Sequence, residues 1–590
     1  MNLLRRLATP APARRRPAPL PPAAEVAEPR RMLTTIVVDS LADDGVATSA
    51  VPDGQVTLRE AVIAANTNQP FGDAPAGNGR DRIRFADGLT GTITLTRGQM
   101  RIEQEVDVRA YEDITIDADG QSRVFSVLAA GDNYFQGLTL TNGNADRGGA
   151  VLHNGRGTVR FTDVTFTGNN ATTNGGALAL ENAERAIVFR TTFTGNTATG
   201  NGGAVHARGG GRIQFFASDV GLTNGGNSAQ SGGGIAALDD TRVELRGGRV
   251  AANNGSVAGG GVWMDGEGSL ATLVVRNDAT VTGNSAPEGG GVFIADTAVS
   301  ALGFTLSGNN AARGGGMFVS GGGRGAATRT TFSLNTAGEG GGLYTEATGR
   351  SLRLAQSDVT SNNATRGGGV FVAAGTFTTN DSTYAMNTAS QGGGVYLDGA
   401  DLSSARDAFQ QNSASGDGGG VHFNAATGTL LRTVFTGNTA TRGGGAFLGG
   451  AANRKVVRGA LLEFNGNDAG SGGGLAATAG RFDLAAPLFT ANGNANGQGG
   501  GAYLTGSGDL TVRSAEFRGN FANRGAGAYL ANPAGTLTLA AGGQGDVALF
   551  AENVAADAGG AVFREALDLV ARDGGRFSFE NNAPDDLAGP

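Results

Sequence analysis

The sequence predicts an all-β fold, a right-handed, single-stranded parallel β-helix of about 16–20 coils with one short N-terminal capping helix. Three observations predict it. A double glycine recurs about every 27 residues, an asparagine lies a few residues before most of these pairs, and apolar residues follow them at every second position. A fixed period of this length is typical of a solenoid. The right hand follows from the crossover rule for parallel strands.

The glycine content distinguishes a β-solenoid from a helical one. Glycine accounts for 103 of 590 residues while proline accounts for 15, which excludes collagen. Each glycine inside a helix costs about 1 kcal/mol relative to alanine, so glycine pairs at every junction exclude helical repeats. The pairs begin at Gly148, Gly175, Gly202, Gly232, Gly259, Gly289, Gly314, Gly340, Gly367, Gly392, Gly418, Gly443, Gly472, Gly499, Gly525 (followed by Ala) and Gly559.

The asparagine before each glycine pair predicts a hydrogen-bonded column. One unit reads Phe-x-x-Asn-x-Ala, a short turn, Gly-Gly, then apolar-x-apolar. In stacked coils like residues lie above one another, so we expect amide-to-amide hydrogen bonds along the axis, with phenylalanines in the interior beside them. The predicted structural ladder contains Asn169, Asn196, Asn335, Asn387, Asn412, Asn438, Asn467, Asn520 and Asn553.

The fourth residue after the first glycine is aromatic in most coils. Its neighbours, such as Val292 and Ile294, are apolar and expected to point inward, so alternation predicts that the aromatic residue points outward into solvent. Exposed aromatic columns are typical of binding faces, whereas stacked rings that only stabilise a sheet, or an inverted alternation, are the alternatives. The candidate binding stripe contains Trp263, Phe293, Phe318, Tyr344, Phe371, Tyr396, Phe447, Tyr503, Tyr529 and Phe563.

The chain before the repeats divides into two predicted segments. Residues 1–33 form a basic, proline-rich leader expected to be disordered, and residues 34–80 form a cap on the solenoid of residues 81–590. Within the cap, 34–38 is expected to be a strand and 57–66 a helix that starts with a capping box of Thr57 and Glu60. The helix would cover the open edge of the first coil. Arg59 and Glu60 are expected to form a helix-surface pair without catalytic function.

Three resemblances extend these predictions. Residues 56–61 (Val-Thr-Leu-Arg-Glu-Ala) resemble the CSLREA motif, which precedes β-helical repeats in large bacterial exported proteins. Residues 27–33 resemble the LEPR-x-LL motif of planctomycete surface proteins, with Ala27 and Met32 in place of leucines. Residues 148–582 resemble the repeats of chlamydial polymorphic outer-membrane proteins. These resemblances imply a right-handed β-helix located outside a bacterial cell or at its surface or outer membrane.

The composition excludes several kinds of chemistry. The absence of cysteine excludes disulfides, zinc–thiolate sites and cysteine nucleophiles. A net charge of −8 with a single lysine disfavours nucleic acid as a partner, and the lack of long apolar runs predicts no transmembrane segment. No catalytic, metal or cofactor site is expected. The nearest carboxylate clusters are interpreted as turn residues: Asp117 with Asp119, Asp239 with Asp240, and Asp265 with Glu267.

We therefore expect an exported, surface-associated protein with an adhesin-like or structural role and no enzymatic activity. The expected partners are a glycan, a cell-surface protein or a second copy of the chain. The alternative is a polysaccharide lyase or glycoside hydrolase, which would show a cleft with convergent aspartate and arginine groups. A filament-forming solenoid is a third possibility.

Overall fold

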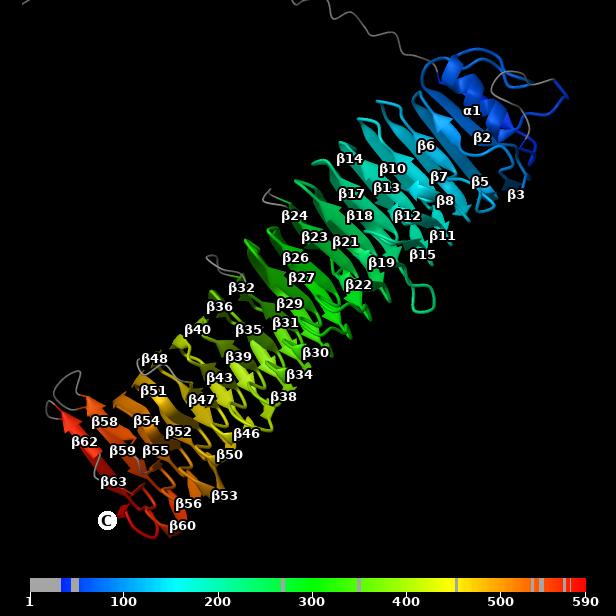
Figure 1. Ribbon diagram of the computed structural model, residues 1–590. Helices are drawn as coiled ribbons and strands as arrows, with labels where there is room; N and C mark the ends of the chain where they lie inside the picture. The colour runs from blue at the N-terminus through cyan, green and yellow to red at the C-terminus, as the bar shows by residue number, and fades with distance from the viewer. Residues whose placement is uncertain are drawn as a thin grey trace, which may run out of the picture.

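The computed structural model describes residues 33–43, 52–266, 271–346, 352–450, 455–531, 535–540, 546–565, 569–572 and 575–589. Figure 1 shows an elongated rod with its only described helix, α1, at one end and the C-terminus at the other. The motif at residues 27–33 lies outside the described residues except for Leu33.

The strands stack as a parallel β-solenoid of about 18 turns, which confirms the predicted fold class. Each turn passes through four faces, which we number in chain order from the double glycine. The register between turns is regular: Val370 pairs with Val395, one coil later, and Val395 pairs with Val421. Stacking at the parallel-strand spacing of about 4.8 Å therefore places equivalent residues of successive coils in columns.

The first face follows the double glycine. Its strands are β4 (Met100–Ile102), β6 (Phe125–Val127), β9 (Val151–His153), β13 (Leu178–Glu181), β17 (Val205–Arg208), β20 (Ile235–Leu238), β23 (Val262–Asp265), β26 (Val292–Ala295), β28 (Met317–Ser320), β31 (Leu343–Thr345), β35 (Val370–Val372), β39 (Val395–Asp398), β43 (Val421–Asn424), β47 (Ala446–Gly449), β57 (Ala528–Leu530), β61 (Val562–Arg564) and β64 (Leu587–Ala588).

The second face comes next in each coil. Its strands are β1 (Thr34–Val38), β2 (Asp81–Phe85), β10 (Thr158–Thr162), β14 (Arg185–Phe189), β24 (Thr272–Arg276), β32 (Leu352–Ala355), β36 (Thr376–Asn380), β40 (Asp401–Ala405), β44 (Thr427–Leu431), β48 (Val456–Ala460), β58 (Thr536–Ala540) and β62 (Leu569–Arg572).

The third face precedes the asparagine. Its strands are β3 (Gly91–Thr94), β11 (Thr165–Thr167), β15 (Thr192–Thr194), β25 (Thr280–Thr282), β33 (Asp358–Thr360), β37 (Thr383–Ala385), β41 (Ala408–Gln410), β45 (Val434–Thr436), β49 (Glu463–Asn465), β52 (Leu488–Thr490), β55 (Glu516–Arg518), β59 (Val547–Ala551) and β63 (Arg576–Glu580).

Several longer strands bend across two faces. Those spanning the second and third faces are β5 (Val106–Asp117), β7 (Asn133–Thr141), β18 (Arg212–Val220), β21 (Arg242–Ala251), β27 (Ala298–Ser307) and β29 (Arg324–Ser333). Those spanning the first and second faces are β51 (Leu475–Ala485) and β54 (Ala502–Arg513).

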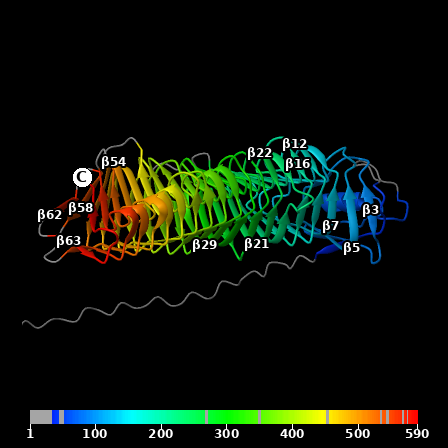
Figure 2. The same ribbon diagram turned by 90° about the horizontal axis from the view of Figure 1, so that it is seen from below.

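The fourth face lies between the asparagine and the next double glycine, and forms two separate sheets. Figure 2 shows β12, β16 and β22 on the opposite side of the rod from β21 and β29. Its strands are β8 (Asn144–Arg147), β12 (Asn170–Asn174), β16 (Thr197–Ala198), β19 (Ser228–Ser231), β22 (Asn254–Ala258), β30 (Thr336–Glu339), β34 (Asn363–Arg366), β38 (Thr388–Ala389), β42 (Ser413–Ala414), β46 (Thr439–Arg442), β50 (Asp468–Ser471), β53 (Gly493–Gln498), β56 (Phe521–Arg524) and β60 (Val554–Ala558).

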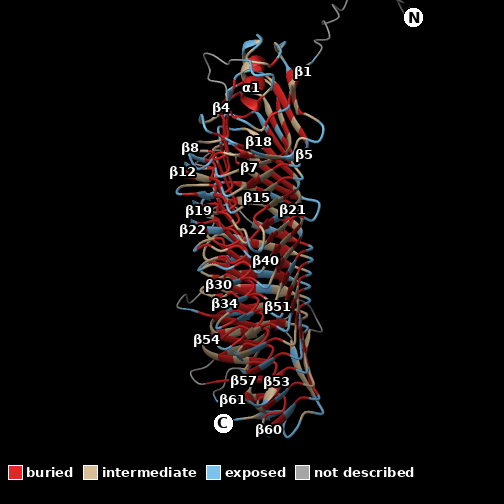
Figure 3. Cartoon of the chain, turned by 90° about the vertical axis from the view of Figure 1, so that its right-hand side faces the viewer, coloured by how far each residue is buried: buried red, intermediate tan, exposed pale blue. Residues whose placement is uncertain are grey.

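One hydrophobic core runs along the rod, from Ile36 in the first strand to Val562 near the last coil. Buried residues extend over the length of the molecule in Figure 3. The phenylalanines of the repeat form a column inside this core. From Tyr384 to Phe550, successive ring centroids are 4.5–5.0 Å apart and nearly parallel. Each coil therefore packs mainly on its two neighbours, as expected of a solenoid.

The double glycine is required by the backbone at the turn into the first face. Gly367 has a φ of 63°, in the left-handed region. A Cβ on Gly368 would lie 2.5 Å from the carbonyl oxygen of Thr388 and 2.6 Å from that of Gly393 in the next coil. Any side chain at Gly368 would therefore push the coils apart.

The helix α1 (Leu58–Thr67) caps the N-terminal end of the core. Thr57 and Glu60 form the predicted capping box, and the predicted stripe that includes Leu58 and Ala61 is buried. The helix continues to Thr67, slightly beyond the predicted end, because Asn68 in the left-handed conformation provides its C-cap. It contacts β1, β2 and β4, so it covers the edge of the first coil.

Candidate functional site

An unbroken column of asparagine side chains connects the coils at the corner between the third and fourth faces. Asn362 is representative: its Nδ2 donates to Oδ1 of Asn387 (3.0 Å) and to the carbonyl of Phe332 (2.9 Å). Its Oδ1 accepts from the backbone N–H (3.0 Å) and Nδ2 (2.9 Å) of Asn335. Both amide hydrogens and both acceptor positions of the buried side chain are thus used.

Every asparagine of the predicted ladder lies in this column. The structure adds seven further members to the ladder, and in four of them valine or leucine replaces the phenylalanine three residues earlier, as Val250 does before Asn253. For all of them except Asn582, which no double glycine follows, the position five to seven residues before a double glycine is the signal that identifies them. The added members are Asn227, Asn253, Asn284, Asn309, Asn362, Asn492 and Asn582.

The aromatic residues of the candidate binding stripe point away from the main core, where the alternation places them. Their neighbours Val292 and Ile294 belong to that core, whereas Phe293 belongs to a separate cluster on the outer side of the first face. The cluster contains Ala258, Phe293, Phe318, Tyr344, Phe371 and Tyr396, with Trp263 packed against it.

The expectation that this stripe faces solvent is wrong for most of its members. Phe318 is only 1 % exposed and Phe371 only 2 %, and Phe447 and Tyr529 are also buried. Trp263, Tyr503 and Phe563 are partly exposed. Side-chain alternation predicts which side of a strand a residue occupies, but not what packs against that side.

Two contacts bury the stripe. From Phe293 to Tyr396 the rings stack with centroids 4.8–5.2 Å apart and interplanar angles of 2–11°. Arginines that precede the double glycine cover the column from the fourth face: the guanidinium of Arg313 lies 5.1 Å from the centre of Phe318, and that of Arg366 lies 5.0 Å from Phe371. The ring faces are therefore occupied and cannot stack on a sugar.

The covering arginines are held by carboxylates one coil earlier. Arg313 pairs with Glu288 and Arg366 with Glu339. Further along, Arg442 pairs with Asp417 at 2.6 Å and lies over Phe447. Ion-paired arginines thus cover the outer side of the aromatic column. Trp263 lies at the end of the column, because its neighbour on one side is Ala236 and on the other side Phe293.

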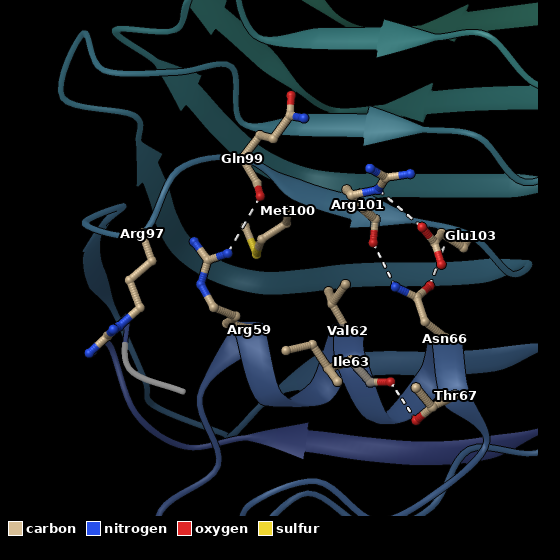
Figure 4. A pocket seen from close by; sticks show the side chains of 10 residues that line it. All are labelled: Arg59, Val62, Ile63, Asn66, Thr67, Arg97, Gln99, Met100, Arg101 and Glu103. Atoms are coloured by element: carbon tan, nitrogen blue, oxygen red, sulfur yellow. Dashed lines mark hydrogen bonds and ion pairs between the residues drawn. The ribbon is translucent and has the colours of Figure 1, made fainter. Parts of the chain in front are cut away.

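The N-terminal cap contains a second candidate site, a cleft of about 390 Å³ between α1 and the loop that leads to β4 (Figure 4). Val62 and Ile63 line one wall and Met100 and Arg101 the other. Asn66 bridges the walls, because its Nδ2 donates to the carbonyl of Arg101 (2.7 Å). The side-chain amide of Asn66 therefore attaches the helix to the first coil.

Arg59 is not the helix-surface residue that the sequence predicted. It is 8 % exposed and pairs with buried Asp43 through Nε (2.7 Å) and Nη2 (3.1 Å). The same Nη2 donates to the carbonyl of Gly98 (2.7 Å), and Asp43 accepts from the backbone N–H of Thr96 (2.6 Å). This network fixes α1 to the loop, while Glu60 serves the capping box.

The histidines are buried singly. Burial lowers the pKa of His153, His206 and His422 to about 4, so each is neutral at physiological pH. His422 stacks in the aromatic column between Tyr396 and Phe447. Burial also raises the pKa of Asp407 to about 6, although Ser404 and the backbone N–H of Ser382 donate to its carboxylate.

One of the predicted carboxylate clusters, Asp117 with Asp119, makes local contacts. Asp117 accepts from the backbone N–H of Asp119 (2.8 Å) and from Asn142 (3.0 Å), as expected of a turn residue. Glu267 lies outside the described residues. Within the described ranges, no group of three or more His, Asp or Glu residues could hold a metal ion, and no helix is long and apolar enough to cross a membrane.

The repeat model of the Chlamydia polymorphic membrane proteins matches three stretches of the chain, residues 163–181, 190–208 and 432–450. Each of the first two runs from the end of one second-face strand, through the asparagine and the double glycine, to the following first-face strand. No curated protein and no solved structure matches the chain. The resemblances of residues 56–61 and 27–33 to exported-protein motifs stay predictions.

Proposed function

We propose that the chain is an exported, surface-associated β-helical protein with an adhesin-like or structural role, rather than an enzyme. The observation that carries this proposal is how the repeat uses its polar and aromatic residues. The asparagines and outer rings of successive coils bind one another along the axis, which favours a rigid rod that displays its outer faces. The matches to a surface-protein repeat support the same location.

Surface accessibility on intact cells tests the location. Cells that express the chain are treated with a protease that does not enter them, and the chain is followed with an antibody alongside a cytoplasmic protein as control. We expect the chain to be cleaved or shed while the control stays intact. Equal protection of both proteins would contradict the proposal.

The role of the outer aromatic column requires a separate test. Replacing Tyr344, Phe371 and Tyr396 together by serine removes three adjacent rings from the stack. Because the ring faces are occupied, we expect the triple variant to unfold at lower temperature, while a glycan array shows no ligand lost relative to the parent chain. Loss of a glycan signal with unchanged stability would assign the column to binding.

A polysaccharide lyase or glycoside hydrolase is the alternative. Incubation with pectic and other acidic polysaccharides, followed by measurement of new reducing ends, distinguishes the two, since an enzyme releases them in proportion to its concentration. We expect no release above the rate of heat-treated protein.

A further inference from the structure

The outer side of the second face carries a dense group of arginines over five adjacent strands, β10, β14, β18, β21 and β24. These strands lie side by side in the N-terminal half of the rod (Figure 1). We call this group the arginine face. It consists of Arg160, Arg185, Arg212, Arg242, Arg246 and Arg276.

The arginines are stacked in register along the axis. Arg185 pairs in the sheet with Arg212, and Arg212 with Arg242, so three guanidinium groups occupy successive coils of one column. In a second column, Arg246 pairs with Arg276. Like charges directly opposite each other across strands are unfavourable unless an anion lies between them. The arrangement therefore favours the approach of a negatively charged partner.

One buried carboxylate compensates only part of this charge. The side chain of Glu244 is 0 % exposed and pairs with Arg212 (2.7 Å), Arg242 (2.6 Å) and Arg246 (2.8 Å). Burial alone would raise its pKa, but the hydrogen bonds from these arginines and Gln214 outweigh burial and hold the pKa well below its usual range. Glu244 is thus a permanent anion that organises the three guanidinium groups, and it cannot act as a general acid.

Positive charge remains in excess at the surface. Arg160, Arg185 and Arg276 are exposed, and Arg212 and Arg242 are each about two-fifths exposed despite their contact with Glu244. Arg185 is held in place by Gln214, a neutral acceptor. Acidic residues border the face, but two of them are already paired with arginines outside the face: Asp163 with Arg190, and Asp219 with Arg249.

The charge is densest in these coils, because later coils carry only single arginines in the column of Glu244, Arg353 and Arg458. Between these two arginines the column holds the neutral residues Thr378 of β36, Ser403 of β40 and Thr429 of β44. In a chain of net charge −8, a face of six arginines around one carboxylate is therefore a distinct electrostatic feature.

We propose that the arginine face binds an acidic polysaccharide, with the polymer running along the axis so that carboxylate or sulfate groups meet guanidinium groups of successive coils. Arginine suits this role because its planar fork forms charge-assisted bonds to such oxyanions. The inference rests on the proposed binding role and names its ligand class.

Single-stranded nucleic acid is the less favoured polyanion. Its non-specific binding combines phosphate contacts with bases stacked on free aromatic faces. The rings near this face are already covered by guanidinium groups: Arg190 lies 4.4 Å from the centre of Phe189, and Arg246 lies 5.5 Å from that of Phe216. Binding of sugar carboxylates to arginine does not require a free aromatic ring face.

The test measures binding of fluorescein-labelled polygalacturonate to the purified full chain by anisotropy, with dextran and single-stranded DNA as competitors. The test variant is Arg160→Ser/Arg185→Ser/Arg276→Ser, which leaves the Glu244 cluster intact. The matched control removes three exposed arginines from later coils: Arg353→Ser/Arg458→Ser/Arg481→Ser. Both variants have the same net charge, so the comparison isolates the location of the lost charges.

We expect salt-sensitive binding that the test variant weakens at least about tenfold and the control less than about twofold. Equal weakening by both variants, no binding by the parent chain, or stronger competition by DNA than by unlabelled polygalacturonate would overturn the proposal. If the test variant misfolds, protection of Arg160, Arg185 and Arg276 from phenylglyoxal by polygalacturonate in the parent chain decides the question. Cell location plays no part in these measurements, so their failure is distinct from failure of the proposed function.

Discussion

Replacing Asn362 by alanine removes one member of the asparagine ladder, and the contacts of Asn362 determine how much stability is lost. The backbone N–H and one Nδ2 hydrogen of Asn335 lose their acceptor, and the carbonyl of Phe332 loses a donor. All lie in the buried corner, where an unsatisfied donor costs about 1–3 kcal/mol. The loss of an acceptor for these two donors of Asn335 is therefore expected by itself to lower the free energy of unfolding by about 2–6 kcal/mol.

The matched control is Asn363→Ala, because Asn363 is the next residue in the chain and is exposed on the fourth face. Urea unfolding followed by circular dichroism should show a lower midpoint for Asn362→Ala only. Hydrogen exchange should show faster exchange of the Asn335 amide in that variant, since its acceptor is gone. Equal midpoints for the two variants, with unchanged protection of Asn335, would refute the reasoning.

Three further outcomes are expected. Arg59→Ala should lower the thermal midpoint by leaving buried Asp43 unpaired, while Arg97→Ala should not, and equal effects would contradict the role of the ion pair. His153 has a pKa near 4 when folded and about 6.5 when unfolded, so its contribution to stability is complete above pH 6.5 and is lost as the pH falls toward 4, by about 3 kcal/mol. The variant His153→Leu places at this position the residue type of Leu180, its partner in the next coil. It should reduce the change in the unfolding midpoint between pH 7 and pH 4, and an unchanged pH dependence would contradict the lowered pKa of His153. Phe371→Ser should cost about 3–5 kcal/mol of unfolding free energy in denaturant titration, because it breaks the outer stack, and a loss below 1 kcal/mol would show that the ring is not packed.

The coil period and the inward columns could be predicted from sequence because they depend on local rules. A glycine pair fixes a turn that other residues cannot adopt, as at Gly367 and Gly368, and each repetition starts one coil. Alternation then places Val292 and Ile294 in the core. The asparagine before the turn follows from the need to satisfy buried amides, and its position alone would have identified members such as Asn253.

Two features depended on residues that are distant in sequence. Phe371 is buried by rings one coil away on either side and by Arg366, whose position is set by Glu339 in the preceding coil. Arg59 is buried because the chain brings Asp43 and the loop at Gly98 against the helix. The hydrophobic pattern of the sequence does not predict these contacts.

The amino-acid pattern is sufficient to specify a parallel β-solenoid, because the period, the glycines and the alternation all act within one coil or between equivalent positions of successive coils. Which of the outward-pointing residues are exposed to solvent depends on contacts between faces that form only in the folded chain. The aromatic column is closed because arginines from a neighbouring face reach over it, whereas the arginine face stays open because only one carboxylate, Glu244, lies within it. Exposure depends on what packs across a corner of the coil, and register along the axis does not specify that.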